Sequence, residues 1–456
     1  MKLRRAPDPA TLWFLLAFAV SAAPAALAQD AAAPDTATRL SLADAVRAAA
    51  SGTPAVQIAQ LHVDQAKARI GEARGAYLPG ISGTASDFNR TFSLKAQGIT
   101  FPSIPGSPLI PDPIGPVGQF DARVHASQAI VDIAAIQKVK SADQGERQSQ
   151  ANRGTTSETA AQSTALAYLR AVRAQELVSA RQADLQIASD LLDLANAQQA
   201  AGTAPSIDAT RARSQMAVSR SQLILARNLA DQSQIDLARS LGLDPGTRFV
   251  LTDTLGSQSA MSDAPEEPQT AVGTALERRS ELMAERAAQS KARYDASAIS
   301  SERIPRLEAL GDWGLSGQHA YDGVTTYEYG LALTWPLIDG GRRESRISEQ
   351  RSVLRESQVR EKDLRDQIAA DVRGALLDIA SGREQQQVAS ERLSLAGEEL
   401  AQARERFVNG VAGNIEVIDA QSSLIRARDV DIEARFAVAA ARVALARAVG
   451  VARTLR

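Results

Sequence analysis

The sequence predicts a mainly helical protein with membrane-type β-strands, built as two copies of one unit. Three observations predict this architecture: a composition rich in Ala and Leu with only 4% aromatic residues, long stretches without proline, and short segments in which apolar and polar residues alternate. With 456 residues, of which 44% are hydrophobic, the chain is long enough for two or three folded domains.

The N-terminal residues have the pattern of a secretory signal peptide. Basic residues precede an apolar run from Leu12 to Val20, and small residues follow up to Ala28. We expect cleavage after Ala28, so that residues 1–28 are a signal peptide. A retained membrane anchor is the alternative, but an anchor needs ~20 apolar residues and this run stops near ten.

Charge and cysteine content exclude several classes of site. Without residues 1–28 the formal net charge changes from −2 to about −4, which does not favour nucleic acid as a partner. The chain has no cysteine, which excludes disulfides, thiolate metal sites and a lipid-modified cysteine at the mature N-terminus. We therefore expect a protein that is not lipidated and is attached to a membrane, if at all, by its fold.

Few residues suggest catalysis or metal binding. The three histidines, His62, His125 and His319, belong to different expected elements. A glycine-rich phosphate loop and a Gly-x-Ser-x-Gly motif are both absent from the sequence. We expect no catalytic residues, no metal site, no cofactor and no enzyme activity.

Proline placement predicts two very long helices. Six of the eighteen prolines lie in Phe101–Pro116, whereas none lies between Pro116 and Pro205 or after Pro336. A first helix over Ile133–Gln199 would be about 100 Å long at a rise of ~1.5 Å per residue. In the second region an apolar residue recurs at heptad spacing, at Leu393, Ala396, Leu400, Ala403 and Phe407, and Ile418, Ile425 and Ile432 continue the pattern.

An internal repeat relates the two halves of the chain. A shift of 208 residues places Gly202 on Gly410 and the segment 237–242 on 445–450, and a shift of 226 places Pro79 on Pro305. We expect a first repeat over 29–242, a small irregular linker over 243–268, a second repeat over 269–450, and a C-terminal tail over 451–456. Each repeat would contain a helix, a β-hairpin, a long helix and a further helix.

Four segments are candidates for β-strands. Tyr327–Trp335 alternates strictly, with five large side chains at the odd positions, and Phe120–Gln128 alternates more weakly. Gly80–Arg90 and Arg306–Gln318 precede them. Aromatic residues that border an apolar band are typical of a membrane interface, and we assign that role to Trp313, Tyr327, Tyr329, Trp335 and Phe120.

The strands constrain the assembly. A half-buried sheet of a soluble α+β protein would show the same alternation. However, two isolated hairpins in a helical sequence have no evident partner, and an open sheet edge is incompatible with lipid, so we expect them to pair with strands of other chains. Four strands are too few for a barrel, whereas two chains supply eight and three supply twelve, and a trimer leaves room for a lumen.

Ordered motifs identify a family resemblance. They are Leu42–Val46 with Thr53-Pro54, Tyr77–Ile81, Gln128–Asp132, Trp335–Gly341 (WPLIDGG), Arg406–Gly410 (RFVNG) and Glu416–Gln421 (EVIDAQ). Because these motifs occur in this order, the chain resembles the TolC-like outer-membrane efflux proteins, and the resemblance extends from Leu40 to Gly450.

The resemblance implies a fold, a location and partners. The fold is a homotrimer whose twelve strands form one transmembrane β-barrel in outer-membrane lipid, continued by a long α-helical periplasmic tunnel. The implied location is the outer membrane of a Gram-negative-type bacterium, extending into the periplasm. The implied partners are a periplasmic adaptor protein and an inner-membrane transporter, in a tripartite efflux or type I secretion system.

The same resemblance points to a gate at the periplasmic end. Asp208, Glu416 and Asp419 are the acidic residues near the helix turns, and a ring of carboxylates would favour cations. Helix capping is the alternative reading, because Ser206 and Asn414 are good N-cap residues and the helix dipole prefers acids nearby. Capping does not explain Asp419, which lies further into its helix.

The turns themselves are candidate contacts for the adaptor. They contain the small residues Gly202, Thr203, Ala204, Gly410, Val411 and Ala412, although a glycine-terminated helix would look the same. The best-known relative has a basic residue at the place of Ala412, which helps latch its closed state. Here Arg404 and Arg406 are the alternative partners for a carboxylate.

Two other functions share some of these features. A periplasmic adaptor or helical scaffold protein of a secretion complex would have the signal peptide, the Ala-rich heptads and the turn glycines. A soluble structural coiled coil would have the heptads. Neither needs aromatic, alternating strands, so the strands favour the channel.

Overall fold

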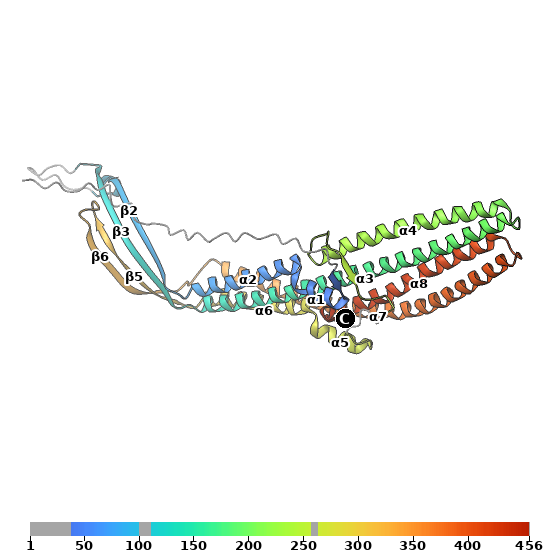
Figure 1. Cartoon of the computed structure of the whole chain (residues 1–456). Coiled ribbons are helices and arrows are strands. Elements are labelled where there is room, and N and C mark those ends of the chain that lie inside the picture. The colour runs from blue at the N-terminus through green and yellow to red at the C-terminus, as the bar shows by residue number, and fades with distance from the viewer. Residues whose placement is uncertain (1–37, 100–110, 257–262, 456) are drawn as a thin grey trace, which may run out of the picture.

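The computed structural model describes residues 38–99, 111–256 and 263–455 of the chain. The expected signal peptide, residues 1–28, lies outside these residues. The molecule is elongated, with a β-sheet at one end, two helix-helix turns at the other, and long helices along its whole length (Figure 1).

The main elements follow one another in the same order in the two halves of the chain. The first half contains α1 (Leu42–Gly52), α2 (Pro54–Gly75), β2 (Gly80–Phe92), β3 (Ile114–Val131), α3 (Ile133–Ala200) and α4 (Ser206–Ser240). The second contains α5 (Pro268–Arg278), α6 (Ser280–Ser301), β5 (Arg306–Gly317), β6 (Val324–Thr334), α7 (Arg342–Val408) and α8 (Asn414–Val449). Short elements are β1 (Thr38–Leu40), β4 (Phe249–Leu251) and two 3₁₀ turns, η2 (Lys95–Gln97) and η3 (Ala452–Thr454).

The two long helices extend over most of the molecule. Helix α3 has 68 residues and α7 has 67, which corresponds to about 100 Å each at ~1.5 Å per residue. The bounds expected for α3 are confirmed to within one residue. Its start is fixed by Asp132, whose carboxylate accepts a hydrogen bond from the Ala135 backbone N–H at 2.9 Å and caps the helix.

Small side chains pack the helices near the turns. The heptad positions Ala396, Leu400, Ala403 and Phe407 of α7 are all buried, as the sequence predicted. They share one thin core with residues of α3, α4 and α8, among them Leu191, Ala195, Ala212, Val417, Ala420 and Leu424. Because alanine allows close approach of the backbones, four helices pack there with few large side chains.

The four long strands form one antiparallel sheet in the order β2-β3-β5-β6. The two hairpins therefore pair with each other through β3 and β5, with Phe120 opposite Gly317 and Ala129 opposite Glu308. The expectation that each hairpin has partners only on other chains is wrong. Contacts between residues about 190 positions apart leave no mark in a local alternation pattern, which is why the sequence did not indicate this pairing.

The largest core lies midway along the molecule, around Tyr168. This side chain is fully buried among residues of α1, α3, α8 and the ends of both halves. Its phenol oxygen lies 2.7 Å from Asp253 Oδ2 and 3.0 Å from the Leu40 carbonyl oxygen. Asp253 also accepts a hydrogen bond from the Leu42 backbone N–H at 2.8 Å, so one carboxylate joins the linker to the start of α1.

The linker between the halves is more ordered than expected. Residues Phe249–Leu251 form β4, which pairs in parallel with β1, Thr38 opposite Phe249 and Leu40 opposite Leu251. This pairing was not predictable from the sequence, because both strands have only three residues. The linker thus adds a small sheet to the central core.

The hydroxyl group of Tyr168 is expected to contribute measurably to stability. Tyr168→Phe removes the donor that faces Asp253 and Leu40 and leaves buried acceptors short of a partner. We expect the free energy of unfolding to fall by about 1–3 kcal/mol. The measurement is the midpoint of denaturant-induced unfolding, followed by circular dichroism at a fixed protein concentration.

Tyr294→Phe is the matched control, because the Tyr294 ring contacts Lys140 and the substitution keeps the ring. A pH series gives a second check. Burial, and then the Asp253 carboxylate, raise the pKa of Tyr168, so the neutral phenol is favoured in the folded state. The stabilisation that the neutral Tyr168 hydroxyl contributes is present below the ordinary pKa of about 10 and is lost as the pH rises above that value. Equal stability of the two variants would contradict the assignment.

Candidate functional site

The four-stranded sheet has an apolar face that is exposed. The register places Trp313 directly opposite both Val124 and Tyr327, and Leu331 and Leu333 lie further along β6 on the same face of the sheet. These side chains are turned outward: Leu331 is 69% exposed and Tyr329 is 82% exposed. In the described part of the chain nothing covers this face, and a contiguous exposed apolar face of this kind marks an interaction surface.

The opposite face of the sheet is polar and less exposed. Arg123 forms ion pairs with Asp121 on its own strand and with Asp312 of β5 at 3.0 Å. His125 and Thr84 lie 3.1 Å apart on the same face, between β3 and β2. A sheet in water normally buries its apolar face and exposes its polar face. This sheet does the reverse.

The aromatic residues singled out in the sequence lie on the apolar face or at its end. Tyr327 and Tyr329 stack with ring centroids 6.4 Å apart, and Trp313 is the strand neighbour of Tyr327. Trp335 directly follows β6, at the end of the sheet nearest the helices, and its indole N–H donates to the Arg303 carbonyl oxygen at 3.2 Å. Phe120 is half-buried near the distal end of β3.

Within residues 38–99, 111–256 and 263–455, no helix combines the length and the apolar character required to cross a membrane. Over the same ranges, no three His, Asp or Glu side chains are grouped so that they could hold a metal ion.

The two helix-helix turns at the far end have the same backbone structure. Gly202 and Gly410 have positive φ angles of 72° and 70°, which a glycine adopts without strain. In each turn the next N–H reaches back to the last helical turn, from Thr203 to the Gln198 carbonyl and from Val411 to the Arg406 carbonyl, both at 2.9 Å. Both long helices thus end in a Schellman motif.

Ser206 and Asn414 are not N-caps, contrary to the alternative reading of the sequence. The N-cap residues are Pro205 and Gly413, and neither makes a side-chain capping bond. Asn414 instead is fully buried and donates from its side chain to the Asp208 backbone carbonyl at 2.6 Å. The amide therefore joins the starts of α8 and α4, a role that its position in the sequence did not reveal.

The three candidate gate carboxylates have different surroundings. Asp208 is 6% exposed, and its carboxylate lies 3.7 Å from Arg211. Glu416 is partly exposed and pairs with Arg406 at 3.4 Å. Asp419 is exposed, three residues after Glu416 on α8, and forms no ion pair with a described residue.

Near the turns, two arginines pair with carboxylates, as expected for a chain that has Ala412 in place of a basic residue. Arg406 contacts Glu416, and Arg404 lies 3.8 Å from Asp190 of α3. Both pairs are exposed, so each stabilises the structure only slightly.

A buried ionic network joins α3 to α8, and it was not predicted from the sequence. Asp184 is fully buried and forms ion pairs with Arg181 of its own helix at 3.0 Å and with Arg428 of α8. Arg181 also pairs with Asp429 at 2.6 Å, and Gln421 donates to the Asp184 carbonyl at 3.1 Å. The only signal in the sequence was the spacing of three between Arg181 and Asp184.

Comparison with protein families gives a match over most of the chain. The family described as "Outer membrane efflux protein" matches residues 45–243 and again residues 271–451. Each match begins within the first helix of a half and extends over the second helix, the hairpin and two further helices.

Individual relatives agree with this match. The pyoverdine export outer membrane protein OpmQ of Pseudomonas putida is 24% identical over 343 residues, which is 73% of this chain and 70% of OpmQ. The nickel-cobalt-cadmium resistance protein NccC of Alcaligenes xylosoxydans xylosoxydans is 28% identical over 140 residues, 31% of this chain and 32% of NccC.

Among solved structures, the CmeC outer membrane channel of Campylobacter jejuni superposes with a TM-score of 0.75 at 16% identity. The superposition covers 90% of this chain and 86% of CmeC, so the two share the fold along almost their whole length.

The ionic network is expected to hold α8 against α3. Asp184→Asn removes the charge that compensates Arg181 and Arg428, and breaking a buried ion pair in this way costs about 3–5 kcal/mol. We expect the backbone amides of α8 near Gln421 to exchange hydrogen faster in the variant. Hydrogen exchange followed by mass spectrometry measures this directly.

The control is Asp190→Asn, which removes a carboxylate of the same helix from an exposed pair with Arg404. We expect a loss below about 1 kcal/mol there. If α8 exchanged at the same rate in both variants, the network would have no special role.

Proposed function

The chain belongs to the outer membrane efflux protein family, and from this premise we propose that it is the channel component of a tripartite efflux or type I secretion system. The observation that carries the proposal is the exposed apolar face of a sheet whose other face is polar. A channel wall needs this arrangement, with apolar side chains toward lipid and polar side chains toward a water-filled lumen. The rival reading, a periplasmic adaptor or scaffold, gives this face no role.

The dimensions of the apolar face suit a bilayer. From Tyr327 to Trp335 the strand advances about 27 Å at ~3.4 Å per residue, and a tilt of ~40° reduces this to about 20 Å along the membrane normal. The apolar band of outer-membrane barrels is roughly 25 Å tall and has aromatic residues at both borders. Tyr327 and Trp313 would lie near one border and Trp335 near the other, with Leu331 and Leu333 between them.

Closure of the barrel would require more than one chain. In a single chain β2 and β6 are the edges of the sheet. An unpaired edge in lipid leaves backbone N–H and C=O groups without partners, at a cost of several kcal/mol each. Pairing of β6 with β2 of the next chain in a homotrimer removes all edges and gives twelve strands.

The paired halves support a duplicated architecture. Helices α3 and α7 have 68 and 67 residues, and α4 and α8 have 35 and 36. On this basis the first repeat extends over residues 29–242 and the second over 269–450, joined by the 243–268 linker. In a trimer the long helices continue the barrel as a tunnel into the periplasm.

The turn end would then be the periplasmic mouth of the tunnel. Asp419 is the exposed carboxylate there, and three chains would bring three copies near one axis, with Glu416 beside them and Asp208 behind. The turns at Gly202–Ala204 and Gly410–Ala412 would meet a periplasmic adaptor, which connects the channel to an inner-membrane transporter.

Fractionation tests the location. We expect the mature protein to sediment with outer membranes and to stay there after washing with salt or carbonate, and to be released only by detergent. Recovery in the soluble periplasm without detergent would exclude a channel.

The lipid-facing assignment predicts a contrast between neighbouring positions. Leu331→Arg places a charge at the centre of the apolar face, at a cost of about 2–4 kcal/mol per chain, and we expect the amount of assembled protein in the membrane to fall sharply. Gly330→Arg is the control at the same depth on the polar face, where an added Cβ would meet no atom within 4 Å. Equal assembly of both variants would contradict this orientation.

The gate assignment predicts a change in ion selectivity. In water, a carboxylate ~10 Å from a passing cation attracts it by about 0.4 kcal/mol. Asp419→Asn would remove three such carboxylates from a trimer, so we expect the preference for cations over anions to fall several-fold. Reversal potentials in planar bilayers measure the preference. Glu349→Gln, an exposed carboxylate near the sheet end of α7, is the control. Unchanged selectivity in the Asp419 variant would exclude this residue from the constriction.

A further inference from the structure

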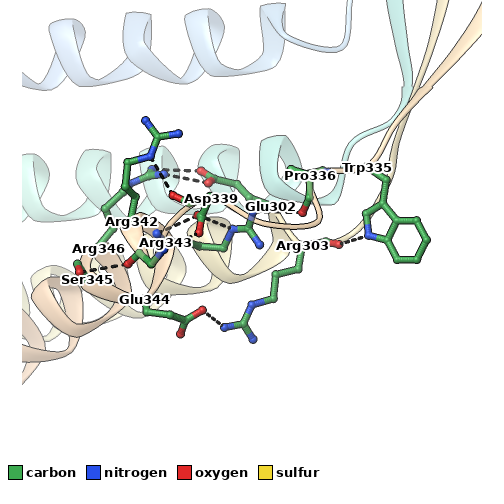
Figure 2. Close-up of polar contacts among 11 residues, drawn as sticks. Glu302, Arg303, Trp335, Pro336, Asp339, Arg342, Arg343, Glu344, Ser345 and Arg346 are labelled. Atoms are coloured by element: carbon green, nitrogen blue, oxygen red, sulfur yellow. Dashed lines mark hydrogen bonds and ion pairs between the residues drawn. The ribbon is translucent and has the colours of Figure 1, made fainter.

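The junction between the sheet and the helices contains a charged hollow of about 550 Å³. Its walls come from the start of α3, the end of α6, the first residue of β5, the last residue of β6, the linker that leads into α7, and the first turns of α7 itself. Figure 2 shows the linker side of this region, where Arg342, Arg343 and Arg346 gather around Asp339 and Glu302.

Cations outnumber carboxylates around the hollow. The cationic side chains are Lys138, Arg306, Arg342, Arg343 and Arg346. Three carboxylates, Asp132, Glu302 and Asp339, face the same space, which leaves an excess of two positive charges. A hollow with this balance attracts anions.

The carboxylates are already engaged. Glu302 forms two hydrogen bonds with Arg346, at 2.9 and 3.1 Å. Asp132 caps α3, as described above. Asp339 accepts from the backbone N–H groups of Gly341 and Arg343 at 3.2 and 3.0 Å, and so caps α7.

Two of the cations lack a carboxylate partner among the described residues, namely Lys138 and Arg342. The guanidinium of Arg342 donates only to the Asp339 backbone carbonyl, at 3.3 Å (Figure 2). Arg306, by comparison, lies 3.3 Å from Glu308. The positive charge that remains is therefore at Lys138 and Arg342, on two elements of the wall.

The guanidinium of Arg343 forms an ion pair with Asp339 and donates to the Pro336 carbonyl oxygen at 3.5 Å, but one of its N–H groups has no acceptor. The Arg343 side chain is more than nine-tenths buried, and its Nε makes no hydrogen bond within the described residues. The nearest carboxylate oxygen, Asp339 Oδ2, is 3.6 Å away, beyond hydrogen-bond distance. A buried N–H without an acceptor costs about 1–3 kcal/mol, so such a group in a cationic hollow indicates an anionic ligand.

We propose that this hollow binds a phosphate-class anion, held by Arg343 with Arg342 and Lys138. Planar guanidinium groups bind phosphate oxygens through paired N–H donors, and a lysine adds a mobile charge. Two sources offer this chemistry. One is an anionic phospholipid headgroup, because Trp335, which we assign to the membrane interface, lies beside the junction. The other is a soluble phosphate, because the Trp335 ring points away from the arginines in Figure 2.

The experiment uses the full-length protein, purified as its native assembly in a neutral detergent. Native mass spectrometry compares adducts of phosphatidylglycerol, which is anionic, with those of phosphatidylcholine, which is zwitterionic. Isothermal titration calorimetry measures binding of inorganic phosphate. The test variant is Lys138→Gln with Arg342→Gln, and the control is Arg351→Gln, an exposed arginine of α7 outside the hollow.

We expect affinity for the anion to fall about fivefold for each cation removed, and to stay unchanged in the control. Phosphatidylglycerol adducts that depend on the two cations identify the lipid source. Binding of inorganic phosphate that depends on them, without a preference for phosphatidylglycerol, identifies the soluble source. If the wild-type protein bound neither probe, or if the double variant bound as well as the wild type, the proposal would be wrong.

Discussion

The pairing of β3 with β5 is the interaction on which the rest of the structure depends. It joins two hairpins from opposite halves of the chain into one sheet, and its register aligns Val124, Trp313 and Tyr327 in a single apolar row. A slip by one residue would move each side chain of one hairpin to the other face. The same pairing places the start of α3 beside the end of α6, where Ser141 donates a hydrogen bond to Asp295 at 2.5 Å, so the sheet register also sets how these two helices meet (Figure 1).

The helical part compensates for a thin core in two ways. Near the turns, alanine at alternate seam positions lets four helices approach closely, with larger side chains such as Leu191, Leu400 and Phe407 between them. Where side chains are too small to fill space, buried polar contacts specify which helices meet, as Asp184 and Arg428 do for α3 and α8. Such contacts fix alignment more than they add stability, because desolvation of the charges offsets much of their attraction.

The sequence predicted what depends on local pattern. The bounds of α3, the strand segments, the buried heptad positions and the small-residue turns follow from proline placement and periodicity, which act within a few residues. It did not predict the β3–β5 pairing, the β1–β4 pair or the Asp184 network, because these join residues far apart in the chain. The capping reading of Asn414 was wrong for a related reason: a buried acceptor on α4 competes for its amide, and sequence position does not show that competitor.

The hydrogen bond from Asn414 has a consequence for how the chain can change over evolution. Its acceptor is the backbone carbonyl of residue 208 and not the side chain, so almost any residue at position 208 would preserve the bond. Position 414 has no such freedom, because a shorter or apolar side chain would leave the carbonyl unpaired. Position 208 can therefore vary while position 414 is constrained, and exchange of the acidic residue at 208 would change the charge near the helix-helix turns while α4 and α8 stay joined.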